Sequence, residues 1–131
     1  MKVLLYVDGW QGDEVALAEV LSGEVSGVDW EICRHLVHLA KLVSQPGREW
    51  AAVVAAVGSP ADLRVLEPFG DQLSRLGLLL ILPNQDDTMV ALGHRLAPRF
   101  LAGGSDAPSL IAQVLGQMVR SRDSRPCQGA G

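Results

Sequence analysis

The sequence predicts one α/β domain in which five parallel strands form a doubly wound sheet with helices on both faces. Five short runs rich in Val, Ile and Leu alternate with longer segments in which apolar residues recur every three or four positions. This alternation is typical of repeated βα units, because neighbouring parallel strands need a crossover segment between them. The nearly continuous apolarity of the first run, "KVLLYV", also favours a strand that helices cover on both faces.

The expected strands are defined by their apolar runs and by the turn residues that follow them. The five strands are expected at Lys2–Val7, Asp29–Cys33, Ala51–Val57, Leu78–Leu82 and Arg99–Gly103. Alternation of Trp30 and Ile32 with polar residues predicts an edge or near-edge position for the second strand. The small and β-branched residues of the third strand predict the centre of the sheet, where helices pack closely on both sides.

Each expected strand is followed by a segment with helical spacing. The apolar positions that define these helices are Val15, Ala18, Leu21 and Val25; Leu36 to Val43; Leu63, Leu66, Phe69, Leu73 and Leu76; Met89, Val90 and Leu96; and Leu110, Ile111, Val114, Leu115 and Met118. Ser59 and Pro60 have the order of an N-cap and a first-turn proline, so the third helix is expected to begin there. Pro68 and Gly70 predict a kink within it. The acidic pair 86–87 favours the positive start of the fourth helix.

Length and composition are those of one compact domain. The 131 residues are 48% apolar, which is enough for one substantial core. From Ser121 the sequence becomes polar and rich in Gly, Ser and Arg, with little apolar surface to bury. We therefore expect a domain over residues 1–120 and a polar C-terminal tail over residues 121–131.

Charge and cysteine content argue against several partners and environments. The net charge is −4, with 11 Lys and Arg, so no concentrated basic field is expected to attract nucleic acid or an anionic membrane. Apolar runs such as residues 76–83 are far shorter than the roughly 20 residues of a membrane span. Two distant cysteines, Cys33 and Cys127, and an N-terminus without a basic, apolar leader indicate a cytoplasmic protein.

Two stretches of the sequence resemble response-regulator receiver domains of bacterial two-component signalling. "VLLYVDGWQGDEVALAEVL", residues 3–21, is similar to the first strand, acid pair and first helix of that family, with Asp8 at the first acid position. "RFLAGGSDAPSLIAQVL", residues 99–115, is similar to the fifth strand and fifth helix, with Phe100 at the spacing of the switch aromatic. The resemblance covers roughly residues 1–120 and implies a CheY-like, flavodoxin-like (βα)5 fold.

The reactive positions of that family are mostly substituted. In receiver domains two acids after the first strand hold Mg²⁺, an aspartate after the third strand accepts the phosphoryl group, and a Ser or Thr and a Lys follow the fourth and fifth strands. In this sequence Asp8 and Gly9 stand at the two acid positions, and Val57 or Gly58 stands at the phosphoacceptor position. Pro83 or a neighbour replaces the Ser or Thr, and Gly103 replaces the Lys. One remaining carboxylate cannot supply the oxygen ligands that Mg²⁺ requires, and no lysine pairs an aspartyl phosphate. The resemblance therefore implies an atypical, or pseudo-, receiver that is not an enzyme, needs no cofactor and acts independently of phosphorylation.

Several residues around this vestigial acid pocket allow two interpretations. Asp8 either ends the first strand by accepting bonds from backbone amides, which we favour, or forms a weak divalent-ion site with Asp13. Gly103 and Gly104 before Ser105 either form a turn, which is again favoured, or expose their amides to an anion.

Two further patterns do not meet the requirements of a metal site or a catalytic triad. Cys33, His35 and His38 straddle a strand end and a helix start without a fourth ligand nearby in the sequence, whereas structural zinc normally has four. Ser59 lacks the flanking glycines of a hydrolase elbow, and no histidine has an assigned acid partner. No metal site and no nucleophile are predicted.

The surface expected to bind a partner is formed by the helix around residues 89–96, the strand Arg99–Gly103 and the final helix. In receiver-like proteins this face commonly mediates dimerisation or output, so the resemblance implies a protein partner or a homodimer. The candidate contact residues are Arg95, Arg99, Phe100, Gln113 and Arg120, although the same residues also suit a merely solvated face. Trp10 and Trp50 are further surface candidates, and Trp10 either anchors a partner or covers the acid pocket.

Two functions from different classes follow from these observations. The first is a phosphorylation-independent signalling or protein-interaction domain, which would act as a stand-alone module. The second is a flavodoxin-like small-ligand or nucleotide-binding protein that uses the loops Asp8–Gly12, Gly58–Pro60 and Gly103–Asp106 at the carboxyl edge of the sheet. A flavin or nucleotide released by heat from the gently purified protein would favour the second.

Overall fold

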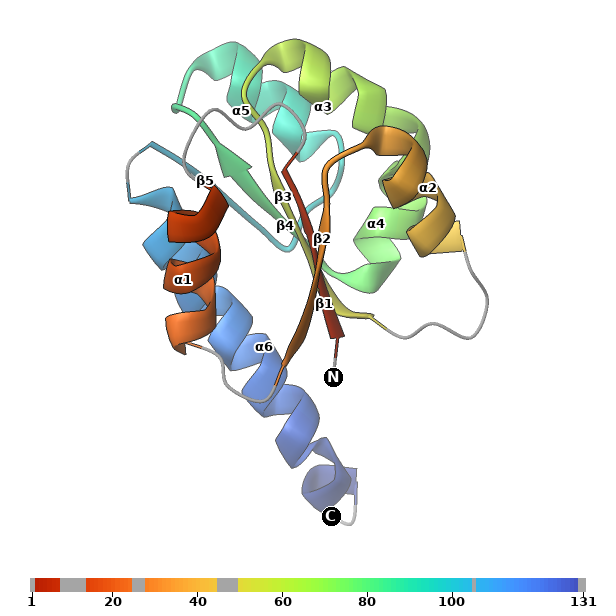
Figure 1. Ribbon diagram of the computed structural model, residues 1–131, viewed down its shortest axis with the longest axis vertical. Coiled ribbons are helices and arrows are strands. Elements are labelled where there is room, and N and C mark those ends of the chain that lie inside the picture. Colours follow the sequence, from red (N-terminus) through yellow and green to blue (C-terminus); the bar gives the residue numbers. More distant parts are fainter. Residues whose placement is uncertain (1, 8–13, 25–27, 45–49, 105, 130–131) are drawn as a thin grey trace.

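The structure, a computed structural model, describes residues 2–7, 14–24, 28–44, 50–104 and 106–129 (Figure 1). Its strands are β1 (Lys2–Tyr6), β2 (Asp29–Cys33), β3 (Trp50–Ala56), β4 (Leu78–Leu82) and β5 (Phe100–Gly103). Its α-helices are α1 (Glu14–Glu24), α2 (Leu36–Ser44), α3 (Pro60–Leu66), α4 (Gly70–Leu76), α5 (Asp87–His94) and α6 (Ala107–Gly129), with a short 3₁₀ helix η1 (Glu67–Phe69) between α3 and α4.

The five strands form one parallel sheet in the order β2-β1-β3-β4-β5. This is the strand order of the doubly wound, flavodoxin-like (βα)5 fold, so the predicted fold class is confirmed. The central position of β3 is also confirmed, since all seven of its residues are buried. β2 and β5 are the two edge strands, as the alternation of β2 predicted.

The helices cover the two faces of the sheet unequally. On one face α1 and α6 pack against alternate strand residues such as Val3 and Leu5. On the other face α2, α3, α4 and α5 pack against the residues between them, such as Leu4 and Tyr6. Figure 1 shows α1 and α6 together on one side of the strands. Two apolar cores therefore enclose the sheet, which explains the nearly continuous apolarity of its central strands.

The segment after β3 is interrupted where the kink was predicted. α3 ends at Leu66, a single 3₁₀ turn carries Pro68, and α4 begins at Gly70. Proline lacks the N–H that an uninterrupted helix would use here, so the break follows from its chemistry. Leu63 and Leu73 are nevertheless both fully buried against the same face of the sheet.

Most predicted boundaries agree with the structure to within one residue at each end. β2 and β4 have the predicted bounds, whereas β3 begins one residue earlier than predicted and β5 one residue later. The final helix α6 continues through residues 121–129, the stretch expected to be a polar tail, and extends past the end of the sheet (Figure 1). Among the helices that the structure describes, none combines the length and apolarity that crossing a membrane requires.

Candidate functional site

The carboxyl ends of the strands meet at one edge of the sheet, where ligands bind in doubly wound folds. Val57 directly follows β3, and its N–H donates to the carbonyl oxygen of Ile81 at 3.0 Å. Its side chain is fully buried in the apolar core on the α3 side of the sheet. Val57, one of the two residues that the resemblance matches to the phosphoacceptor, is thus a core residue, and its side chain carries no oxygen.

A carboxylate does lie beside the end of β3, but it comes from the following helix. Oδ2 of Asp62 accepts a hydrogen bond from the N–H of Gly58 at 3.0 Å. Asp62 is the third residue of α3, and Ser59 is its N-cap without a side-chain cap bond of its own. Asp62 therefore caps the start of α3 by reaching back to the preceding turn, a role related to the capping box.

Sequence reasoning missed this role of Asp62. The available signal was the spacing from Ser59 to Asp62, which places an acid three residues after an N-cap serine. The carboxylate of Asp62 lies at the turn between β3 and α3, and one of its oxygens accepts the hydrogen bond from the Gly58 N–H.

The last residue of β5, Gly103, is enclosed by the loop between β4 and α5. Gly103 is buried, and a Cβ added to it would collide with the carbonyl oxygen of Asn84 and lie 2.8 Å from its carbonyl carbon. The side-chain amide of Gln85 donates to the carbonyl oxygen of Gly103 at 3.2 Å. A lysine therefore does not fit at residue 103 unless this loop moves, and Pro83 at the loop's start is exposed.

The remaining pocket residues lie outside the part of the chain that the structure describes. Asp8, Gly9, Trp10 and Asp13 all belong to the segment 8–13. The weak divalent-ion site at Asp8 and the two roles considered for Trp10 therefore stay predictions. The same holds for the ligand loop Asp8–Gly12, and for Ser105 in the loop after β5.

Cys33 and the nearby histidines have separate local contacts. Cys33 is fully buried, and its Sγ donates to the carbonyl oxygen of His35 at 3.2 Å. The Nε2 of His38 lies 4.0 Å from a carboxylate oxygen of Glu31 on β2. Within the described ranges, no three His, Cys, Asp or Glu residues form a group that could hold a metal ion.

Trp50 was predicted as a surface candidate, and that prediction is wrong. It is the first residue of β3 and only 3% exposed. Its indole N–H donates to the carbonyl oxygen of Leu42 in α2 at 3.4 Å. The aromatic ring therefore packs the end of α2 against the sheet, a tertiary contact that the local sequence does not reveal.

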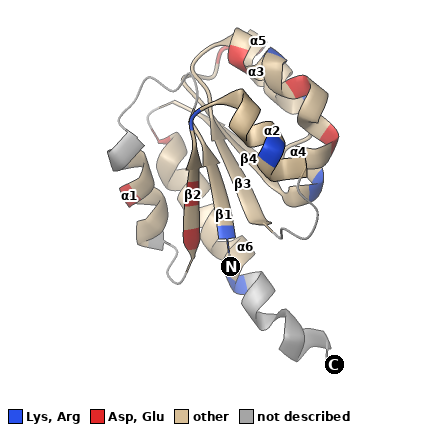
Figure 2. Cartoon of the chain, turned by 45° about the vertical axis from the view of Figure 1, so that its right-hand side comes forward, with Lys and Arg blue, Asp and Glu red and all other residues tan. Residues whose placement is uncertain are grey.

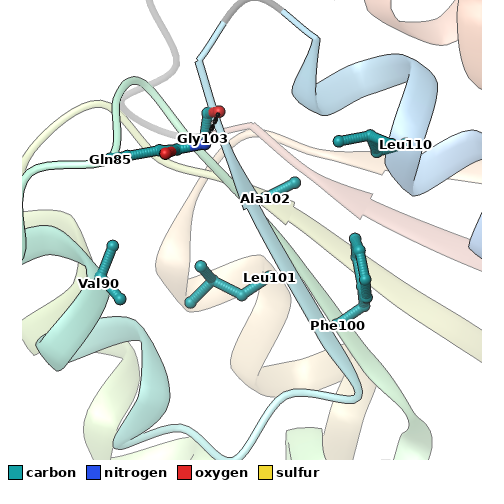
Figure 3. Close-up of a pocket in the computed structure, with 7 residues that line it drawn as sticks. All are labelled: Gln85, Val90, Phe100, Leu101, Ala102, Gly103 and Leu110. Carbon is teal, nitrogen blue, oxygen red and sulfur yellow. Dashed lines mark hydrogen bonds between the residues drawn. The ribbon is translucent and has the colours of Figure 1, made fainter.

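The predicted partner-binding surface corresponds to α5, β5 and α6, and a pocket lies along it. This pocket of about 310 Å³ is lined by Gln85, Val90, Phe100, Leu101, Ala102, Gly103 and Leu110. Figure 3 shows Val90 and Leu101 on one side of β5 and Phe100, Ala102 and Leu110 on the other. The pocket therefore follows the edge strand and has mainly apolar walls from both flanking helices.

The candidate contact residues on this surface are accessible. Phe100 is 37% exposed and its neighbour Leu110 on α6 is 42% exposed. The polar candidates Arg95, Arg99, Gln113 and Arg120 are exposed as well. The elements of this face thus carry both exposed apolar and exposed polar side chains, a combination found in many protein interfaces.

Charge is distributed over the surface without one dominant region in the view of Figure 2. Its blue segments are separated from one another on β1, before and within α2, beside α4 and on α6, and its red segments include β2, which carries Asp29 and Glu31. The ion pair between Arg95 Nε and Glu67 Oε1, 3.6 Å apart, is largely solvated and contributes little to stability.

Two regions are thus distinct. At the carboxyl ends of β3 and β5, Val57 is buried, Asp62 caps the start of α3 and Gly103 is enclosed by the Asn84 loop. Along β5 lies an accessible, mainly apolar strip. Comparison of the sequence with models of known protein families and with curated proteins found no match.

Proposed function

We propose that this chain is a receiver-like protein-interaction domain that acts without aspartyl phosphorylation and without catalysis of its own. The observation that carries the proposal is the end of β3, where Val57 is buried and apolar and Gly58 has no side chain, since the resemblance matches one of these two residues to the phosphoacceptor. A phosphoryl group needs an accessible carboxylate, and the one that lies beside this turn, on Asp62, is engaged by the Gly58 N–H.

The environment after β5 supports the same proposal. A lysine that pairs an aspartyl phosphate would have to stand at Gly103, where the loop carrying Asn84 leaves no room for a Cβ. Aspartyl phosphorylation needs a carboxylate positioned to accept the phosphoryl group and a cation that stabilises the charge of the phosphate. Without the acceptor and without the lysine, the domain provides neither.

The interaction surface in this proposal is the face formed by α5, β5 and α6. Phe100 and Leu110 are already exposed on it, so no switch is needed to uncover them. Exposed polar residues of the same elements and of their ends include Arg95, Arg99, Gln113 and Arg120. We therefore assign the domain a constitutive binding role, in a signalling pathway of the two-component kind, with a protein partner or a second copy of the chain as the ligand.

The direct test of the chemistry is exposure of the purified protein to acetyl phosphate with Mg²⁺, followed by intact mass measurement. A receiver domain with a complete set of acids serves as the positive control. The proposal predicts no phosphorylated species under conditions that phosphorylate the control. Stoichiometric, Mg²⁺-dependent addition of one phosphoryl group would overturn it.

A further inference from the structure

β2 is an edge strand, and among the described strands it pairs with β1 alone. The ladder runs from Lys2 beside Asp29 to Tyr6 beside Cys33. In a parallel ladder the N–H and C=O groups of one residue point to the same side, and successive residues alternate between the two sides. The Val7 N–H donates to the carbonyl oxygen of Cys33 at 3.0 Å, so the backbone groups of Cys33 face β1.

Alternate residues of β2 therefore face the open edge of the sheet. Two residues and four residues before Cys33, the backbone groups of Glu31 and Asp29 also face β1. The N–H and C=O groups of Trp30 and Ile32 point the other way. An extended segment that runs along this edge can bond to both residues, which is the geometry of β-strand addition.

The side chains of β2 form an apolar face and an acidic face. Trp30 and Ile32 are partly buried and pack against the core on the α1 and α6 side of the sheet. Glu31 lies on the α2 side, where its Oε2 is 4.0 Å from Nε2 of His38 and 31% of its side chain is exposed. Asp29 shares that side by alternation and is exposed. In Figure 2, β2 lies between α1 and α2 and carries the red acidic segments.

These acids disfavour a second copy of the chain as the added strand. The antiparallel register that pairs the whole of β2 with itself places Glu31 opposite its own counterpart. A register centred on Trp30 places Asp29 opposite Glu31 of the other copy, and one centred on Ile32 leaves only residues 31–33 of the strand in the pairing. Like charges directly opposite each other destabilise a sheet, and charged edge strands commonly prevent self-pairing.

We propose that the β2 edge binds an extended segment of another protein in which lysine or arginine alternates with apolar residues. The basic side chains of this segment lie on the α2 side, beside Asp29 and Glu31, where the charges are complementary. Its apolar side chains lie beside Trp30 and Ile32, whose backbone groups hold the segment in register. β2 and β5 are opposite edges of the sheet, so this site is separate from the proposed α5–β5–α6 binding face and does not depend on it.

The first test is titration of the full chain with a short synthetic peptide that alternates lysine and valine and has blocked ends. One control peptide has glutamate in place of every lysine, and a second groups the same lysines and valines into two separate blocks. The alternating basic peptide is expected to bind at least about tenfold more tightly than either control, because only it matches both charge and spacing. No binding of this peptide, or equal binding of a control, would overturn the inference.

Charge reversal on β2 tests the complementarity. Asp29→Lys places a cation beside the basic side chains of the peptide and is expected to weaken binding about three- to tenfold. Asp71→Lys makes the same change at an exposed acid on α4 and is expected to leave binding unchanged. Circular dichroism confirms that each variant is folded. Equal loss of binding in the two variants would show that only net charge matters, which would contradict a site at β2.

Removal of one outward N–H tests the backbone bonds. Ile32→Pro deletes a donor that β1 does not use, and proline is tolerated on an edge strand in this orientation. Ile32→Ala also shortens the side chain but keeps the N–H, so it is the matched control. The proline variant is expected to bind the alternating peptide at least about threefold more weakly than the alanine variant. Equal peptide binding by the two variants would mean that no strand is added.

Amide hydrogen exchange locates the bound peptide. The amides of Trp30 and Ile32 are expected to exchange readily in the free protein and to be protected when the alternating peptide is saturating. The Glu31 amide, which bonds to β1, is the internal control and is expected to be protected with and without the peptide. Peptide binding that leaves Trp30 and Ile32 unprotected would place the contact elsewhere and overturn the inference.

Discussion

The carboxylate of Asp62 accepts a hydrogen bond from the Gly58 N–H at 3.0 Å, so an acid of α3 holds the turn that follows β3. The same residue donates its own N–H to the carbonyl oxygen of Ser59 at 3.1 Å. Both bonds fix the entry of the chain into α3. This carboxylate therefore has a structural role in the turn between β3 and α3.

Asp62→Ala is expected to destabilise the protein by about 1 kcal/mol, because the Gly58 N–H loses its acceptor at the start of a helix. The measurement is the free energy of unfolding in urea. Asp71→Ala removes an exposed acid from the first turn of α4 and is the matched control for the loss of the helix-dipole interaction. Equal destabilisation by the two changes would show that the bond to Gly58 contributes nothing measurable.

Gly103→Ala is expected to destabilise the protein by about 1 to 3 kcal/mol, because the new Cβ collides with the backbone of Asn84. Gly23→Ala is the control, since a Cβ there meets no atom within 4 Å and alanine favours the helix. Thermal unfolding of both variants checks the prediction. If Gly103→Ala proved as stable as the wild type, the loop before α5 would have room for a lysine at this position.

Trp50→Phe is expected to cost at least about 1 kcal/mol more than Trp30→Phe, because only Trp50 has its indole N–H bonded to Leu42. Trp30→Phe is the matched control, because it is the same substitution at a partly buried tryptophan on the edge strand β2. The comparison uses urea unfolding of the two variants. A larger loss for Trp30→Phe would contradict the anchoring role assigned to Trp50.

The features that the sequence predicted correctly depend on local patterns. Continuous apolar runs located the buried strands such as β4, and alternation located β2 at an edge of the sheet. Pro68 interrupts the segment after β3 because proline lacks the donor that a helix requires, whatever surrounds it. These signals act within one element, so one sequence is enough to detect them.

The features that the sequence did not reveal depend on contacts between different helices, strands and loops. Trp50 was predicted to lie on the surface, but α2 provides its indole N–H with a carbonyl partner, and its side chain is buried. The need for glycine at residue 103 comes from Asn84, nineteen positions earlier, and no local pattern reports that approach. The open edge of β5 likewise follows from the strand order of the sheet, which the spacing of apolar runs does not determine by itself.

The most direct test of the central claim is an amide NMR titration with Mg²⁺ and then with Mg²⁺ plus beryllofluoride, which mimics an aspartyl phosphate. A domain that works without phosphorylation is expected to show no shifts at Val57, Gly58 and Ser59, and none at Phe100 on the binding face. Saturable shifts at the turn after β3 that extend to Phe100 would mean that a phosphate switch operates here, and they would contradict the account.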